Sequence, residues 1–76
     1  MSLHYHINVF WYEPDRCWIA DVPDLEGCSA HGSDAQSAVA EAIIAIEEWI
    51  ACASEFGDPI PVPRYQVPLL AGAKAA

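Results

Sequence analysis

Cys28 and His31 have the residue types of a thiol nucleophile and its base, and they lie three positions apart. A catalytic thiol must lie close to the group that lowers its pKa, in an accessible cleft. Residues three apart on a β-strand point to opposite faces of the sheet, so this pair is poorly placed to act together. We therefore expect no catalytic residue in this pair.

A second group with suitable types is His4, His6 and Cys17. The two histidines would share one face of a strand, and the cysteine could lie on the neighbouring strand, which would give three zinc ligands. Histidines also occur on outer sheet faces without any metal, and we favour that interpretation. We expect neither a metal nor another cofactor.

The third group is Asp21 with Asp24, which could contribute to two-metal phosphodiester hydrolysis. That reaction needs several carboxylates converging on one point. These two straddle a predicted turn, and the first predicted strand supplies no third acid. We therefore expect that the protein is not an enzyme.

The charge balance favours a basic protein partner over nucleic acid. Eleven acids stand against Arg16, Arg64 and Lys74, and the net charge is −8. Nucleic-acid binding neutralises phosphates with Lys and Arg, which are scarce here. An acidic surface attracts a basic partner and accelerates their encounter. We expect protein binding and no direct contact with nucleic acid.

The cysteines and the apolar segments bear on localisation. Three cysteines without CxxC spacing favour reduced thiols in a cytosol over a disulfide framework. The N-terminus has no basic region followed by an apolar run, so we expect no signal peptide. Glu41, Glu47 and Glu48 interrupt the longest apolar stretch, which argues against a membrane span. The expected location is cytoplasmic.

The elements that must position these side chains begin with strands. Residues 3–12 alternate between two faces and are rich in aromatic and β-branched types, a pattern typical of a half-buried strand. Residues 13–16 contain a proline suited to a turn, and residues 17–22 resume the strand pattern. Residues 23–27 predict a second turn and residues 28–31 a short third strand.

A long amphipathic helix is predicted after Gly32. Ser33 could cap it, with Gln36 completing a capping box, or Asp34 could be the cap instead. The helix should continue to about Phe56 and end at a glycine, with a proline shortly afterwards. On a helical wheel we expect a core stripe flanked by alanines, with a polar face opposite. The expected stripe is Val39, Ile43, Ile46 and Ile50.

Ile44 and Trp49 stand out on this helix. Ile44 lies in the acidic face between Glu41 and Glu48, and Trp49 lies at the border of the expected stripe. Both could be margins of the core or single exposed apolar residues, which are common on any surface. Alternatively, they form a contact patch for another subunit.

Alternating prolines follow the helix and predict an extended strap, after which residues 65–67 could add a fourth strand at an edge. The expected fold is α+β, order β-β-β-α-β. It is an antiparallel three-stranded sheet with one long amphipathic helix packed on one face and a short fourth strand. Residues 1–70 would form one domain, and residues 71–76 a disordered tail.

A homo-oligomer is expected from size and composition. Such a short chain buries only about 60% of the surface that its unfolded form exposes. Apolar residues nevertheless make up 54% of the chain, so part of the apolar surface should lie between subunits. We expect a homodimer or homotetramer, formed through an exposed strand edge or through the face with Ile44 and Trp49.

Residues 20–28 read Ala-Asp-Val-Pro-Asp-Leu-Glu-Gly-Cys, and Gly32 follows before the helix. This segment resembles the N-terminal domain of the HicB-like antitoxins, typically Ala-x-Val-Pro-Asp-Leu-Pro-Gly-Cys, then Gly, a cap and an alanine-rich helix. Glu26 stands where that family has proline, and Ser33-Asp34 replaces an acidic residue and Thr. The strap at 57–63 is similar too, so the resemblance covers roughly residues 3–70.

The resemblance implies a partially degenerate RNase H-like or double-stranded-RNA-binding-like domain. It also implies a function in a type II toxin-antitoxin system, in which a small basic HicA-type mRNA interferase is neutralised by direct binding. Many relatives add a C-terminal DNA-binding domain, for which this chain is too short, so we do not expect DNA binding. The alternative is a stand-alone oligomeric binding protein with another ligand.

Within the matching segment we expect mainly structural functions, together with acids that contact the partner. Pro23 lacks the N–H that a strand ladder needs, and a glycine supplies the positive φ of a tight turn. The expected structural residues are Pro23, Leu25, Gly27, Cys28 and Gly32. The expected partner contacts are Asp21, Asp24 and Glu26.

Overall fold

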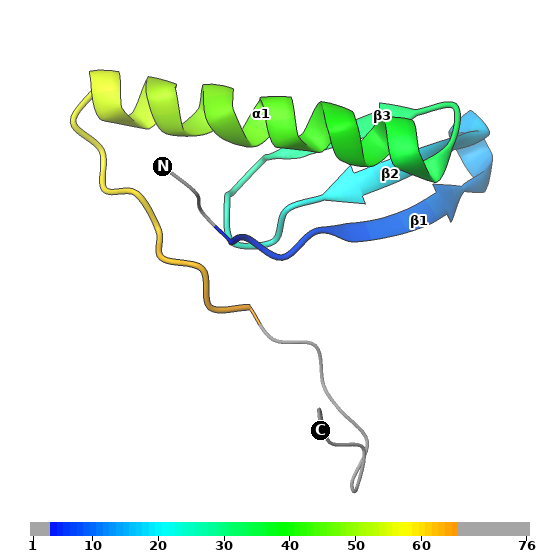
Figure 1. The fold of residues 1–76 in the computed structure, drawn as a ribbon, viewed down its shortest axis with the longest axis horizontal. Helices are drawn as coiled ribbons and strands as arrows, with labels where there is room; N and C mark the ends of the chain where they lie inside the picture. The colour runs from blue at the N-terminus through cyan, green and yellow to red at the C-terminus, as the bar shows by residue number, and fades with distance from the viewer. Residues whose placement is uncertain (1–3, 66–76) are drawn as a thin grey trace, which may run out of the picture.

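The computed structural model describes residues 4–65 of the chain. The elements in order are β1 (Asn8–Tyr12), the 3-10 helix η1 (Glu13–Asp15), β2 (Cys17–Asp21), β3 (Ser29–Gly32) and α1 (Ala35–Glu55). The strands form one antiparallel sheet in the order β1-β2-β3, and α1 lies along one face of it (Figure 1). The predicted α+β fold, with three strands followed by a long helix, is confirmed.

Two predictions concern the C-terminal segment. Tyr65 is described and is not part of a strand, whereas residues 66–67, the rest of the predicted fourth strand, lie outside the described residues. The predicted tail at 71–76 also lies outside them. Residues 58–65 carry no helix or strand and pass from the end of α1 beneath the N-terminal segment (Figure 1).

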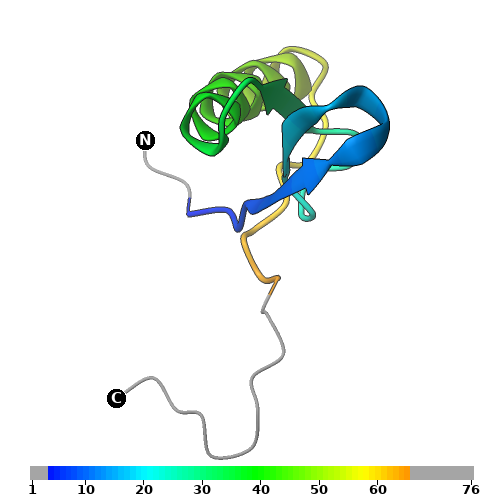
Figure 2. The same ribbon diagram turned by 90° about the vertical axis from the view of Figure 1, so that its right-hand side faces the viewer.

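The strand register assigns each side chain to a face. Val9 lies opposite Ala20, which lies opposite Ala30, and Ala20 is fully buried beneath α1. Partners across an antiparallel ladder share a face, so residues of this row face the helix. The neighbouring row, Phe10 with Ile19 and His31, faces the other way. Figure 2, which looks from one end of the molecule, shows α1 on one side of the sheet only.

The corner between β2 and β3 is held together by backbone hydrogen bonds and buried side chains. The Leu25 N–H donates to the Val22 carbonyl at 3.2 Å, and the Cys28 N–H donates to the Leu25 carbonyl at 3.0 Å. These three side chains are at most 4% exposed and belong to the core. Gly27, which closes the turn, has φ +75°, a conformation that strains any residue with a Cβ.

Asp34 caps the start of α1. Its Oδ1 accepts a hydrogen bond from the Ser37 N–H at 2.7 Å, so the alternative in which Ser33 caps the helix is wrong. At the other end, the Gly57 N–H donates to Ser54 O and the Asp58 N–H donates to Ala53 O. With φ +72° at Gly57, these two bonds form a Schellman motif, and the predicted helix end is confirmed.

The buried residues of α1 are alanines, and the predicted aliphatic core stripe is wrong at Ile43, whereas Ile46 and Ile50 pack against the core as half-buried side chains. Ala38 and Ala42 are fully buried, whereas Ile43 is 48% exposed. The reason is the close approach of the helix to the sheet. A Cβ on Gly32 would lie only 2.6 Å from the Ala38 backbone nitrogen, so only small side chains fit between α1 and β3. Ile43 and Ile44 are exposed instead.

Residues 61–65, which follow α1, form hydrogen bonds with the N-terminal half of the chain. The Tyr5 hydroxyl donates a hydrogen bond to the Pro61 carbonyl. The Asp24 Oδ2 accepts hydrogen bonds from the Arg64 and Tyr65 N–H groups, each at 3.0 Å. These contacts hold residues 61–65 against both the start of the chain and the β2–β3 corner.

Candidate functional site

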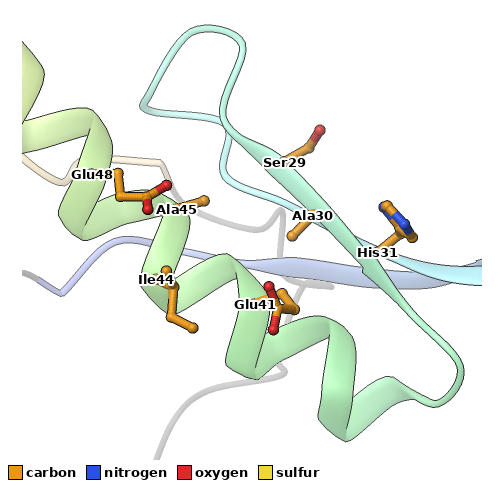
Figure 3. A pocket seen from close by; sticks show the side chains of 7 residues that line it. All are labelled: Ser29, Ala30, His31, Glu41, Ile44, Ala45 and Glu48. Carbon is orange, nitrogen blue, oxygen red and sulfur yellow. The ribbon is translucent and has the colours of Figure 1, made fainter.

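A groove of about 440 Å³ lies between α1 and the edge of β3 (Figure 3). Within residues 4–65, β3 pairs with β2 only, so the backbone groups on its other side have no strand partner there. Ala30 points toward the helix, and Ser29 and His31 point away from it (Figure 3). The lining residues are Ser29, Ala30, His31, Glu41, Ile44, Ala45 and Glu48.

The groove is acidic on its helix side. Glu41 and Glu48 are exposed and lie seven positions apart, which places them two turns apart on one side of α1. Ile44 lies between them and is 46% exposed. Among residues 4–65 neither carboxylate is in a salt bridge, because the one ion pair found there joins Arg16 to Glu13 at the hairpin turn. Two negative charges and an apolar side chain therefore line one groove.

A second hollow of about 320 Å³ continues the groove toward the β2–β3 corner. It shares Ser29, Ala45 and Glu48 with the first hollow and adds Cys52 and Trp49, among others. The two hollows together follow α1 along the β3 edge to the corner.

The Trp49 indole joins this groove to the corner. Its Nε1–H donates to the Glu26 carbonyl at 3.0 Å, and the Glu26 side chain is exposed. Of the three acids predicted to contact a partner, Glu26 is therefore the one beside the groove.

The other two acids lie elsewhere. The Asp24 carboxylate is engaged by the Arg64 and Tyr65 N–H groups, and these hydrogen bonds hold its pKa below the ordinary value. Asp21 lies opposite Ser29 on the sheet face away from α1 and is half-buried. The structure thus does not bring the three acids into one cluster.

Ile44 and Trp49, the predicted subunit contacts, have different environments. Trp49 packs against the core and uses its N–H within the chain, whereas Ile44 is exposed in the groove. Five positions apart on a helix, they point in different directions. In the sequence Glu41 and Glu48 belong to the acidic face of the helix, and Ile44 between them is the signal for a groove.

The structure does not bring together the reactive side chains of the Cys28–His31 pair or of the His6–Cys17 group. Burial raises the pKa of the Cys28 thiol, and the nearby Asp21 raises it further. His31 is exposed on the face away from α1. Cys17 lies opposite Tyr12, six positions from His6 along the strand direction, or about 20 Å. Within residues 4–65, no three His, Cys, Asp or Glu side chains are grouped so as to hold a metal ion.

Within residues 4–65, no helix has both the length and the apolar character that crossing a lipid bilayer requires. All three cysteines are free thiols.

No family model, curated protein or solved structure matches this chain. The likeness to HicB-like antitoxins therefore depends on the residues of the Ala20–Cys28 segment and its surroundings.

Proposed function

We propose that this chain binds a small basic protein along the groove beside β3 and neutralises it by covering its surface. In this proposal the chain is a HicB-like antitoxin of a cytoplasmic type II toxin-antitoxin system, and the partner is a HicA-type mRNA interferase. The observation that carries the proposal is the combination of an open strand edge with Glu41, Ile44 and Glu48 in one groove. The net charge of −8 also favours a basic partner.

Each component of the groove has a separate function in binding. An open strand edge offers N–H and C=O groups to an extended segment of the partner, which can add as a further strand. Glu41 and Glu48 then lie where Lys or Arg side chains of that segment can reach them. Ile44 supplies apolar contact between the two charges.

The two carboxylates contribute more to encounter and selectivity than to affinity. An exposed ion pair stabilises a complex by only about 0.2–1 kcal/mol. Acidic charge does, however, steer a basic partner and disfavour acidic ones. Most of the affinity must therefore come from backbone pairing along β3 and from apolar contact around Ile44.

The proposal is tested by titrating the full chain against a HicA-type interferase and measuring both binding heat and protection of mRNA. Glu41→Gln with Glu48→Gln should weaken binding by about tenfold, the loss of two ion pairs of intermediate strength. Glu47→Gln with Glu55→Gln is the matched control, because both residues are exposed and lie outside the groove lining. This control changes the net charge equally and should bind almost as the natural chain does.

Two results would contradict the proposal. If the natural chain neither binds nor inhibits any basic interferase at low salt, the antitoxin function is wrong. Equal weakening by both double variants would mean that net charge, and not the groove, attracts the partner.

A further inference from the structure

β1 is the opposite edge of the sheet, and unlike the β3 groove it carries no charge. Its sequence is Asn-Val-Phe-Trp-Tyr, and the four residues from Val9 to Tyr12 are each between 38% and 44% exposed. Within residues 4–65 this strand pairs with β2 only. Natural edge strands are usually protected against pairing by a charge, a proline or a bulge. β1 has none of these, and its register with β2 is continuous.

The exposure of β1 follows from the position of α1. The helix lies mainly over β3 and β2, so it leaves the helix-side row of β1, Val9 and Trp11, partly uncovered. Phe10 and Tyr12 project from the other face, which no described helix covers. Apolar side chains are therefore exposed on both faces of the same edge, whereas a half-buried strand normally has one polar face.

We propose that β1 pairs antiparallel with β1 of a second copy, which joins two three-stranded sheets into one sheet of six strands. A two-fold axis beside Phe10 gives the longest overlap of the two strands. In that register Val9 of one copy lies opposite Trp11 of the other, and Asn8 lies opposite Tyr12. Each apolar side chain then packs against an uncharged neighbour on both faces of the joined sheet.

The distribution of charge selects a second copy as the occupant. With a net charge of −8, two copies repel one another wherever acidic surfaces meet. β1 is free of charge, and in this register Glu13, the residue after β1, lies opposite Ile7 of the other copy and not opposite another acid. A basic partner would gain no ion pair along β1. The strand is complementary to itself.

The area of β1 indicates how strong this pairing is. Side chains of this size bury up to about 150–250 Å² each, so two-fifths exposure of four of them offers roughly 300 Å² per copy. A stable complex usually buries about 800 Å² per partner. Backbone pairing adds area, but the interface remains small. We therefore expect a dissociation constant in the micromolar range, roughly 1–100 µM.

The experiment is sedimentation velocity on the full chain from low micromolar to near-millimolar concentration. The natural chain should change from monomer to dimer across this range. Phe10→Lys places a charge at the centre of the edge and should weaken the dimer at least tenfold. Phe56→Lys is the control, because Phe56 is 71% exposed at the far end of α1 and should leave the dimer unchanged.

A second measurement does not depend on any variant. Amide hydrogen exchange of the natural chain should show protection of alternate β1 amides that increases with concentration, because one set of amides already pairs with β2. A monomer at every concentration would overturn the proposal. So would a dimer that Ile44→Lys disrupts and Phe10→Lys does not. Phe10→Lys should still bind the basic partner, so this test is independent of the proposed function.

Discussion

At Gly32, β3 and α1 approach each other closely. A Cβ at this position would lie 2.6 Å from the Ala38 nitrogen and 2.9 Å from the Ser37 carbonyl carbon, which are backbone atoms that cannot move aside. We expect Gly32→Ala to lower the free energy of unfolding by about 3 kcal/mol, at the high end of overpacking costs.

Gly27→Ala is the matched comparison in the same protein. A Cβ there meets nothing within 4 Å, so the cost is only the strain of φ +75°, about 1 kcal/mol. Urea denaturation of both variants measures the difference. A larger loss for Gly27→Ala than for Gly32→Ala would show that the helix does not approach the sheet as described.

Asp24 makes the attachment of residues 64–65 sensitive to pH. Hydrogen bonds from the Arg64 and Tyr65 N–H groups lower the pKa of this carboxyl in the folded chain. A lowered folded pKa means that the contribution is complete above the ordinary aspartate pKa and is lost as the pH falls through the lowered value. We expect both amide proton resonances to titrate together in that acidic range.

Asp24→Asn tests this assignment, because an amide oxygen can still accept a hydrogen bond but does not titrate. The joint acid titration of the Arg64 and Tyr65 amides should disappear from the NMR spectra. Asp15→Asn, an exposed change in η1, should leave it intact. An unaltered titration in the Asp24 variant would mean that another acid controls these amides.

At the scale of elements, α1 packs through small residues. Ala42 is fully buried against the sheet, and a larger side chain there would push the helix away from β2 and β3. We expect Ala42→Leu to destabilise the fold by about 1–3 kcal/mol. Ala40→Leu, an equal change on the exposed side of the helix, should shift the free energy of unfolding by less than about 0.5 kcal/mol. Thermal and urea denaturation measure both.

Ala42→Leu also distinguishes the observed packing from the one expected on the helical wheel. If the stripe with Ile43 were the buried face, Ile43→Ser would be costly and Ala42→Leu mild. The structure predicts the reverse order, because Ile43 is 48% exposed and Ala42 is fully buried.

At the scale of the whole molecule, one edge of the sheet lies beside the acidic groove of α1 and the other edge, β1, is uncharged. Salt screens exposed charges over about 10 Å at 0.1 M ionic strength. We therefore expect added salt to slow association with a basic partner, while the β1 dimer is unchanged or slightly stronger because the copies repel less. Stopped-flow rates at several salt concentrations measure association with the basic partner, and sedimentation at the same concentrations measures the β1 dimer. A dimer that dissociates with salt would contradict pairing through an uncharged strand.

Local patterns in the sequence were enough to predict the α+β fold. The alternation along β1 and β2 and the glycine at position 57 each depend on residues close in the chain, so they can be recognised without the fold. The buried corner with Leu25 and Cys28 was also predictable, because apolar residues flank a turn there. The HicB-like resemblance and the oligomeric state stay predictions.

Tertiary structure decided which face of α1 is buried and where a groove lies. The wheel placed Ile43 in the buried stripe, but the close contact at Gly32 leaves room only for small side chains such as Ala38 beside it, and this contact joins two elements. Likewise, His31 lines a groove with Glu41 and Glu48 only because α1 folds back along β3. Periodicity reports how residues are distributed around one element. How closely two elements approach depends on the shapes of both, and that distance determines the core and the surface.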